Sequence, residues 1–76
     1  MNEEDFSLAA NLARIDPEAA IRKAAKRVIV DGATQSAAAK ESGINQHAVS
    51  VAVKRINKAI AQAQELAASI NQQEEP

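Results

Sequence analysis

The sequence contains no cysteine, one aromatic residue (Phe6), two glycines and two prolines among its 76 residues. The absence of cysteine excludes disulfides and thiolate metal sites. One histidine leaves only carboxylates as further ligands, so no metal or other cofactor is expected. A chain of this length forms a single small domain that buries only about 60% of its unfolded-chain surface. A core this poor in large side chains contributes at most about 3–5 kcal/mol, which leaves self-association as the remaining means of stabilisation.

Long hydrophobic runs are also missing from the sequence. The longest apolar stretches fall far short of the roughly 20 residues that a membrane-spanning helix needs. The acidic start of the chain, at residues 1–5, lacks the basic region of a signal peptide. We therefore expect a cytoplasmic protein with no membrane partner.

Alanine is the most abundant residue, with 18 copies. Because alanine has the highest helix propensity, and glycine and proline are scarce, we predict an all-α fold in a single domain over residues 1–76. Capping signals divide the chain into four predicted helices, over about 3–14, 17–30, 35–41 and 46–70, followed by a disordered tail at 71–76.

The predicted helix boundaries depend on a few residues. Asp16 followed by Pro17 is typical of a helix start, and Gly32 is typical of a helix end. Thr34 and Asn45 are predicted to cap the third and fourth helices. Apolar residues at helical spacing are Leu8, Leu12 and Ile15 on the first helix and Ile21, Ala24, Ala25 and Val28 on the second.

Charge is unevenly distributed along the chain, although the net charge is only −1. All nine lysines and arginines lie within residues 14–58, where four acidic residues leave a net charge of +5, and both ends of the chain are acidic. This asymmetry is compatible with a polyanionic partner or with an ordinary solvated surface. An anionic ligand is the predicted reason for a basic stripe on the second helix, formed by Arg22, Lys23, Lys26 and Arg27.

The segment 35–56 has the spacing of a helix-turn-helix motif. Two helices that cross at about 90–120° need a small residue where they meet and a residue tolerant of positive φ in the turn. Ala39 and Gly43 meet these two needs, and Ile44 and Val49 are placed to hold the second helix against the first. We therefore predict a helix-turn-helix domain with an extended C-terminal helix.

In such a motif the second helix lies in the major groove of DNA. Val49, Val53 and Ile56 fall on one face of this helix, so the opposite face is predicted to meet the DNA. The predicted base-contacting residues are Gln46, His47, Ser50 and Val51. The predicted phosphate-contacting residues are Lys54, Arg55 and Lys58, with Thr34, Gln35 and Ser36 at the start of the preceding helix.

His47 is expected to bond to DNA or water rather than to act in catalysis. No Ser/His/acid arrangement, paired carboxylates, glycine-rich phosphate loop or cysteine nucleophile accompanies it in the sequence. We therefore predict that the protein is not an enzyme and has no small-molecule ligand.

The fourth predicted helix carries an apolar seam that extends beyond the helix-turn-helix segment. Its members alternate by four and three residues, as in a coiled coil: Val49, Val53, Ile56, Ile60, Ala63, Ala67 and Ile70. The predicted homodimer interface consists of Ile60, Ala63, Leu66, Ala67 and Ile70. The alternative is that these residues pack on the first helix of the same chain.

Three segments in and around the predicted helix-turn-helix resemble a known family. Residues 26–35 (KRVIVDGATQ), the turn 42–44 and residues 48–56 (AVSVAVKRI) are similar to the DNA-binding region of the KorA (TrfB) repressors of conjugative plasmids. The resemblance covers about residues 6–60 and implies a homodimeric bacterial repressor that binds palindromic operators of plasmid or mobile-element genes. Val51 stands where the family tends to have a polar residue, and the family's separate C-terminal dimerisation region has no counterpart.

Taken together, these patterns predict a cytoplasmic, DNA-associated repressor that binds a double-stranded operator as a homodimer. The alternative function is a helical protein-interaction module without DNA binding, which uses the seam of the last helix and the basic stripe. Retardation of duplex DNA distinguishes the two.

Overall fold

The computed structural model describes residues 1–74, with side chains described up to residue 70. It contains four helices: α1 (Glu3–Leu12), α2 (Ala20–Ile29), α3 (Gln35–Ser42) and α4 (Gln46–Glu74). No strand is present within residues 1–74. The predicted all-α fold and the number of helices are confirmed.

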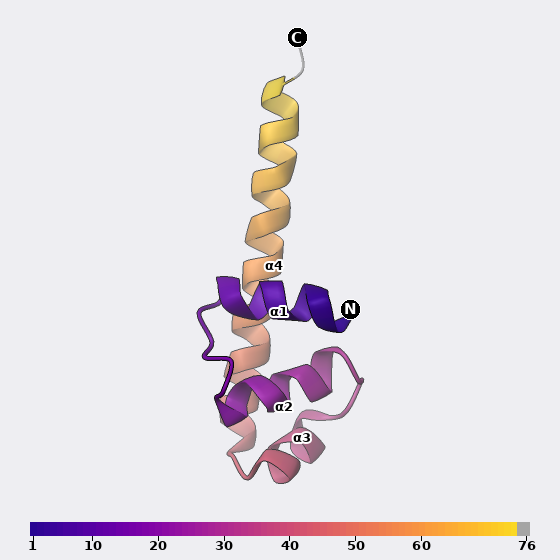
Figure 1. Ribbon diagram of the computed structural model, residues 1–76, viewed down its shortest axis with the longest axis vertical. Coiled ribbons are helices and arrows are strands. Elements are labelled where there is room, and N and C mark those ends of the chain that lie inside the picture. Colours follow the sequence, from indigo (N-terminus) through magenta and orange to yellow (C-terminus); the bar gives the residue numbers. More distant parts are fainter. Residues whose placement is uncertain (75–76) are drawn as a thin grey trace.

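The four helices differ in length and in role. The 29-residue helix α4 is the axis of the molecule, and the other three helices gather around its N-terminal half (Figure 1). Helix α1 crosses α4 near its middle, while α2 and α3 lie closer to the start of α4. Beyond α1, the C-terminal part of α4 projects without a neighbour, which gives the molecule its elongated dimensions of 53 × 20 × 18 Å.

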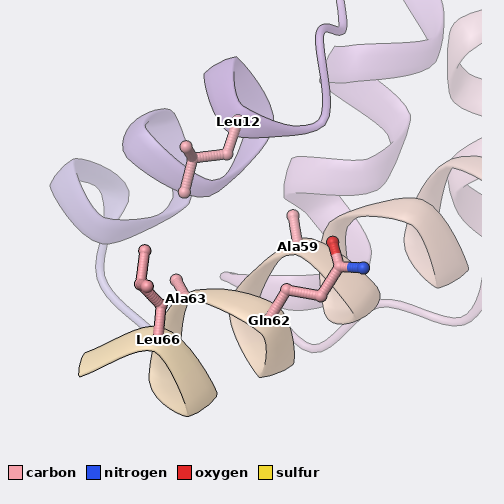
Figure 2. Close-up of a pocket in the computed structure, with 5 residues that line it drawn as sticks. All are labelled: Leu12, Ala59, Gln62, Ala63 and Leu66. Carbon is pink, nitrogen blue, oxygen red and sulfur yellow. The ribbon is translucent and has the colours of Figure 1, made fainter. Parts of the chain in front are cut away.

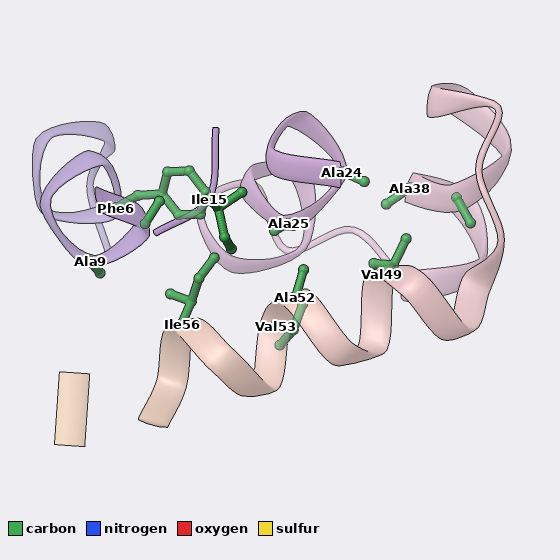
Figure 3. Close-up of a cluster of buried hydrophobic side chains, with 12 residues drawn as sticks. Phe6, Ala9, Ile15, Ala24, Ala25, Ala38, Val49, Ala52, Val53 and Ile56 are labelled. Atoms are coloured by element: carbon green, nitrogen blue, oxygen red, sulfur yellow. The ribbon is translucent and has the colours of Figure 1, made fainter. Parts of the chain in front are cut away.

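The core lies between α4 and the three shorter helices (Figure 3). Its members are Phe6, Ala9, Ala10, Ile15, Ala24, Ala25, Ala38, Ala39, Val49, Ala52, Val53 and Ile56. Val49 and Ile56 are its largest fully buried side chains. Because so many of the remaining members are alanine, the helices approach one another closely around a thin core.

Two predicted capping residues and two predicted turn glycines act as the sequence indicates. The Thr34 hydroxyl accepts a hydrogen bond from the N–H three residues later (3.1 Å), at the start of α3. The Asn45 side chain accepts one from the N–H two residues later (2.7 Å), at the start of α4. Gly43 ends α3 in the left-handed conformation, with φ of 66°, and Gly32, after α2, has φ of 75°.

The predicted start of α2 at Pro17 is wrong, because Asp16 caps a turn rather than a helix. Its carboxylate accepts from the N–H of Glu18 (2.9 Å) and its carbonyl from the N–H of Ala19 (3.1 Å). Ala19 then has extended backbone dihedrals, so that α2 begins at Ala20. On α2, Ala24 and Ala25 are buried as predicted, whereas Ile21 and Val28 are half-buried at the edge of the core.

The face of α1 that the spacing of its leucines indicates as apolar is not the face that the structure buries. Leu8 and Leu12 are 65% and 61% exposed, and the face that meets the core consists of Phe6, Ala9 and Ala10. Ile15 is buried as predicted, but it reaches the core from the loop because the chain leaves the helix after Leu12. Leu8, Leu12 and Ile15 therefore do not share one helical face, because the helix ends before Ile15.

The last helix continues further than predicted. Helix α4 runs to Glu74, so residues 71–74 are helical instead of part of a disordered tail. No proline or glycine precedes Pro76 in this stretch to end the helix earlier. The last two residues of the predicted tail, Glu75 and Pro76, lie outside the described residues.

Candidate nucleic-acid interface

Helices α3 and α4 form a corner joined by residues 43–45. Ala39 is 4% exposed on α3 and Val49 is fully buried on α4, so both belong to the core beneath the corner. The N–H of Ile44 donates to the carbonyl of Ala39 at 3.0 Å, which fastens the turn to the helix before it. The small residue, the left-handed glycine and the β-branched anchor thus take the structural roles predicted for them.

The outward face of α4 carries the residues predicted to contact bases. Gln46 and His47 are exposed, Ser50 is half-buried and Val51 is 40% exposed. At a rotation of about 100° per residue, His47 and Val51 lie across the helix from the buried Val49, whereas Ser50 and Gln46 lie on the flanks. No side chain among these four forms a hydrogen bond or ion pair within the described residues, so their polar groups are available to a ligand.

Two lysines extend this face along α4. Lys54 and Lys58 are exposed and lie one turn apart on the side of α4 that carries Val51. Neither lysine has an ion-pair partner in the part of the chain that the structure describes. Residues 46–58 therefore present a row of free donors and cations, which we call the α4 outer face.

The start of α3 presents a second group of polar residues. Thr34 and Ser36 are exposed and Gln35 is half-buried. The Thr34 oxygen accepts the capping bond from the N–H of Ala37, which leaves its own O–H free to donate. Lys40 is exposed four residues after Ser36, on the same side of α3. Sequence reasoning missed Lys40, although its i, i+4 spacing from Ser36 was a readable signal.

Arg55, which is also predicted to contact phosphate, is exposed and makes one hydrogen bond within the chain. Its Nη2 donates to the carbonyl of Ala13 at 2.6 Å, at the C-terminal end of α1. Carbonyl groups at a helix end lack intrahelical partners and favour a cation. Arg55 therefore holds the end of α1 against α4, a role that requires a partner 42 residues away in the sequence.

Most of the basic stripe on α2 is bonded within the chain. Arg22 is only 9% exposed, and its guanidinium donates to the Asn11 side chain (2.9 Å), the Ile15 carbonyl (3.0 Å) and the Ser7 hydroxyl (3.2 Å). Lys26 forms an ion pair with Glu3 of α1 at 2.6 Å. Both side chains join α2 to α1, so the predicted anionic ligand is replaced by groups of the same chain.

Arg27, the last member of the stripe, connects three parts of the chain. Its guanidinium pairs with Glu41 of α3 (2.9 Å) and with Asp31 in the following loop (3.0 Å). The hydrogen bond from Arg27 holds the pKa of the Glu41 carboxyl below its ordinary value. Lys23 is the one residue of the stripe whose side chain forms neither a hydrogen bond nor an ion pair within the part of the chain that the structure describes.

The Arg27–Glu41 pair predicts a pH dependence of stability. Because the pKa of Glu41 is lowered from 4.5 in the folded chain, its contribution is complete above pH 4.5 and is lost as the pH falls through the folded value. Glu41→Gln should therefore lower the urea midpoint at pH 7, and by progressively less as the pH falls below 4.5; the effect is small because the pair is exposed. A Glu41→Gln deficit that persists undiminished at pH 3 would contradict this assignment.

The residues of the predicted dimer interface fall into two groups. Ile60 is half-buried and packs against the core, whereas Ala63, Leu66, Ala67 and Ile70 are exposed. The alternative, in which the whole set packs on the first helix of the same chain, therefore holds only for Ile60. Leu66 and Ile70 remain 62% and 45% exposed.

Neither a cluster of metal ligands nor a membrane-spanning helix is found in the described residues. Within residues 1–74, no three His, Cys, Asp or Glu side chains are close enough to hold a metal ion. None of the helices in this range combines the length and the apolar character that crossing a bilayer demands.

Comparison with known proteins adds no assignment to this geometry. The chain matches no protein-family model, no curated protein and no solved structure. The residues of the α4 outer face and of the corner beneath it remain the basis for a function.

Proposed function

We propose that this protein is a DNA-binding transcriptional repressor that uses α3, the Gly43 turn and α4 as a helix-turn-helix. It binds a palindromic operator in plasmid or mobile-element genes as a homodimer. The single observation that supports this best is the α4 outer face, where donors and cations gather without partners in the described chain. Four other cations, Arg22, Lys26, Arg27 and Arg55, are bonded within the protein.

The chemistry of the α4 outer face suits the major groove. Gln46 has the paired donor and acceptor that bond adenine in bidentate fashion, and Ser50 bonds either a base or a phosphate. Val51 is an exposed apolar side chain among polar neighbours, and a thymine methyl group is a suitable partner for it. Lys54 and Lys58 lie further along the helix, where phosphates follow the groove edge.

The likeness of residues 26–35 and 48–56 to KorA (TrfB) repressors supports the same function. These segments contain the loop that leads into α3 and the first turns of α4. They therefore coincide with the corner and with the α4 outer face rather than with the core alone. The polar residue that the family tends to have at the position of Val51 implies that this chain reads a different operator.

A shift assay on a pool of random duplex DNA tests the proposal. Retardation is expected at 50 mM salt and should weaken strongly at 200 mM, because binding releases counterions. Repeated selection of the bound duplexes should enrich a palindrome. Absence of retardation at both salt concentrations would favour the alternative of a protein-interaction module.

Single changes on the α4 outer face are expected to alter sequence preference. Gln46→Ala and Val51→Ser should each change the discrimination at one base pair by about 1–3 kcal/mol, while affinity for random DNA stays nearly constant. Competition shift assays with single-base operator variants measure this effect. Lys23→Ala, on an exposed position of α2, serves as the control and should leave the preference unchanged. Unaltered specificity in both outer-face variants would refute the groove-facing assignment.

A further inference from the structure

Most of the large apolar side chains that the structure leaves exposed gather where α1 crosses α4. Met1, Leu8, Leu12 and Leu66 line two hollows between these helices, of about 240 and 380 Å³. Figure 2 shows the first hollow, in which Leu12 of α1 faces Ala63 and Leu66 of α4. We call this region the α1–α4 notch.

The part of α4 that starts at the notch continues past α1 without a further neighbour (Figure 1). Residues 61–70, which we call the overhang, are all exposed, and the first of them line the notch. Ile70 follows Leu66 by one turn and continues the apolar side of the helix away from the notch. The overhang extends a helix that is already nucleated and packed in the core, so it forms without a partner, but its apolar side is left in contact with water.

We propose that a second copy of this chain fills the notch with its own overhang. Each copy carries both halves of such a contact, a groove and an apolar helix that fits it, which is the requirement for an interface with twofold symmetry. The inference extends the homodimer of the proposed function. It adds Leu8 and Leu12 of α1 to an interface that the sequence pattern placed on α4 alone.

Charge favours another copy over a charged partner. Glu65 is the only charged residue of the overhang, and it lies about 140° or more around the helix from Ala63 and Ala67. Two copies with a net charge of −1 each repel each other little. The notch is lined by small, apolar and amide side chains with a single carboxylate, that of Asp5, so it offers too few charges to hold a strongly acidic or basic partner.

The two overhangs must run antiparallel. Each overhang begins at its own notch and leads away from it, so only opposite chain directions bring the end of one overhang to the notch of the other. A parallel pair would instead place the two α1 helices at the same level, Leu12 against Leu12. In the antiparallel pair, Ile70 of one copy approaches Leu12 of the other.

The proposed interface is small. A stable specific interface buries at least about 600 Å² per copy, which one side of the ten-residue overhang and two or three α1 side chains would have to supply. The total, about 1,200 Å², is at the lower end of the range for stable specific interfaces. We therefore expect dissociation in the micromolar range.

Sedimentation of the full chain between 1 and 100 µM tests this interface. The wild type should dimerise, and Leu12→Gln and Leu66→Gln should each raise the dissociation constant at least tenfold. Both leucines are exposed within the chain and glutamine is a good helix former, so helicity by circular dichroism should be unchanged. The matched control is Val51→Gln, at the large exposed apolar residue outside the notch and overhang, and it should dimerise like the wild type.

The direction of the two overhangs can be tested by cross-linking, since the chain has no cysteine of its own. A mixture of Leu12→Cys and Ile70→Cys should form a mixed disulfide on mild oxidation. Leu12→Cys mixed with Ala61→Cys, on the opposite side of α4, should form none. Efficient cross-linking of Leu12→Cys with itself would overturn the antiparallel arrangement.

These outcomes separate the dimer from DNA binding. A monomeric wild type at 100 µM, or a dimer that neither leucine variant weakens, would overturn the notch as the dimer surface. Loss of dimerisation in the leucine variants together with weak residual DNA retardation would support both proposals. A notch-dependent dimer that never retards DNA would leave the interface standing and remove the proposed function.

Discussion

Replacing Arg22 with methionine is expected to lower the free energy of unfolding by about 3 kcal/mol. Methionine keeps most of the apolar stem but removes every N–H donor. The Ile15 carbonyl, which accepts from Arg22 in a buried position (3.0 Å), is then left without a partner. Asn11 and Ser7 lose the bonds that hold α1 against α2.

This loss is large in relation to the size of the protein. At about 0.05–0.15 kcal/mol per residue, a domain of this length has a total stability of roughly 4–11 kcal/mol, and its alanine-rich core favours the lower part of that range. A decrease of about 3 kcal/mol therefore corresponds to a Tm lower by roughly 12–24 °C. Urea and thermal unfolding followed by circular dichroism measure the effect.

Lys23→Met is the matched control for the Arg22 variant. Lys23 is the next residue on α2, is exposed and has no ion-pair partner within residues 1–74, so its replacement should change the stability by less than about 0.5 kcal/mol. Equal midpoints for Arg22→Met and Lys23→Met would show that the guanidinium does not hold α1 in place.

The largest expected effect on binding is that of Lys54→Ala combined with Lys58→Ala. If each lysine contacts one phosphate, the double variant should bind DNA about 100-fold more weakly per bound subunit at 50 mM salt, about tenfold per lost charged contact. The plot of log Kobs against log salt should flatten by roughly 1.8 per subunit, at about 0.9 for each phosphate contact. The loss should be similar for operator and random DNA, since phosphates carry no sequence information.

A double variant of the same charge provides the control. Arg14→Ala with Lys23→Ala also removes two exposed cations, but neither lies on the α4 outer face. Shift assays across a salt series should give wild-type slopes for this control. Identical slopes for the two double variants would mean that binding reflects net charge rather than contacts at the α4 outer face.

The apolar pattern of α1 illustrates what sequence reasoning can miss. Phe6, Ala9, Ala10 and Ala13 recur at i, i+3, i+4 and i+7, a fuller helical pattern than that of Leu8 and Leu12. If large side chains are given more weight, Leu8 and Leu12 are expected to face the core. The structure instead turns the face with one phenylalanine and three alanines toward the core. Periodicity shows that α1 has two apolar faces without showing which one meets α4.

Local residues were enough to locate the corner that the proposed function depends on. The Thr34 and Asn45 caps, the left-handed Gly43 and the buried Val49 act within a few residues of their own positions, so short-range spacing is sufficient to predict them. The spacing of Val49, Val53 and Ile56 likewise places the α4 outer face on the opposite side of its helix.

The roles of the cations were decided only by the tertiary structure. Arg22, Lys26 and Arg55 find their partners 7 to 42 residues away, on helices whose relative placement no local pattern contains. Once α1 crosses α4, the free carbonyls of Ala13 at its end and of Ile15 in the following loop lie within reach of Arg55 and Arg22. The bond from Arg22 to Ile15 is buried, which makes it stronger than a contact with water. The same crossing leaves Leu8 and Leu12 facing the overhang at the end of the core. There they form the exposed apolar surface that we propose a second copy of the chain covers.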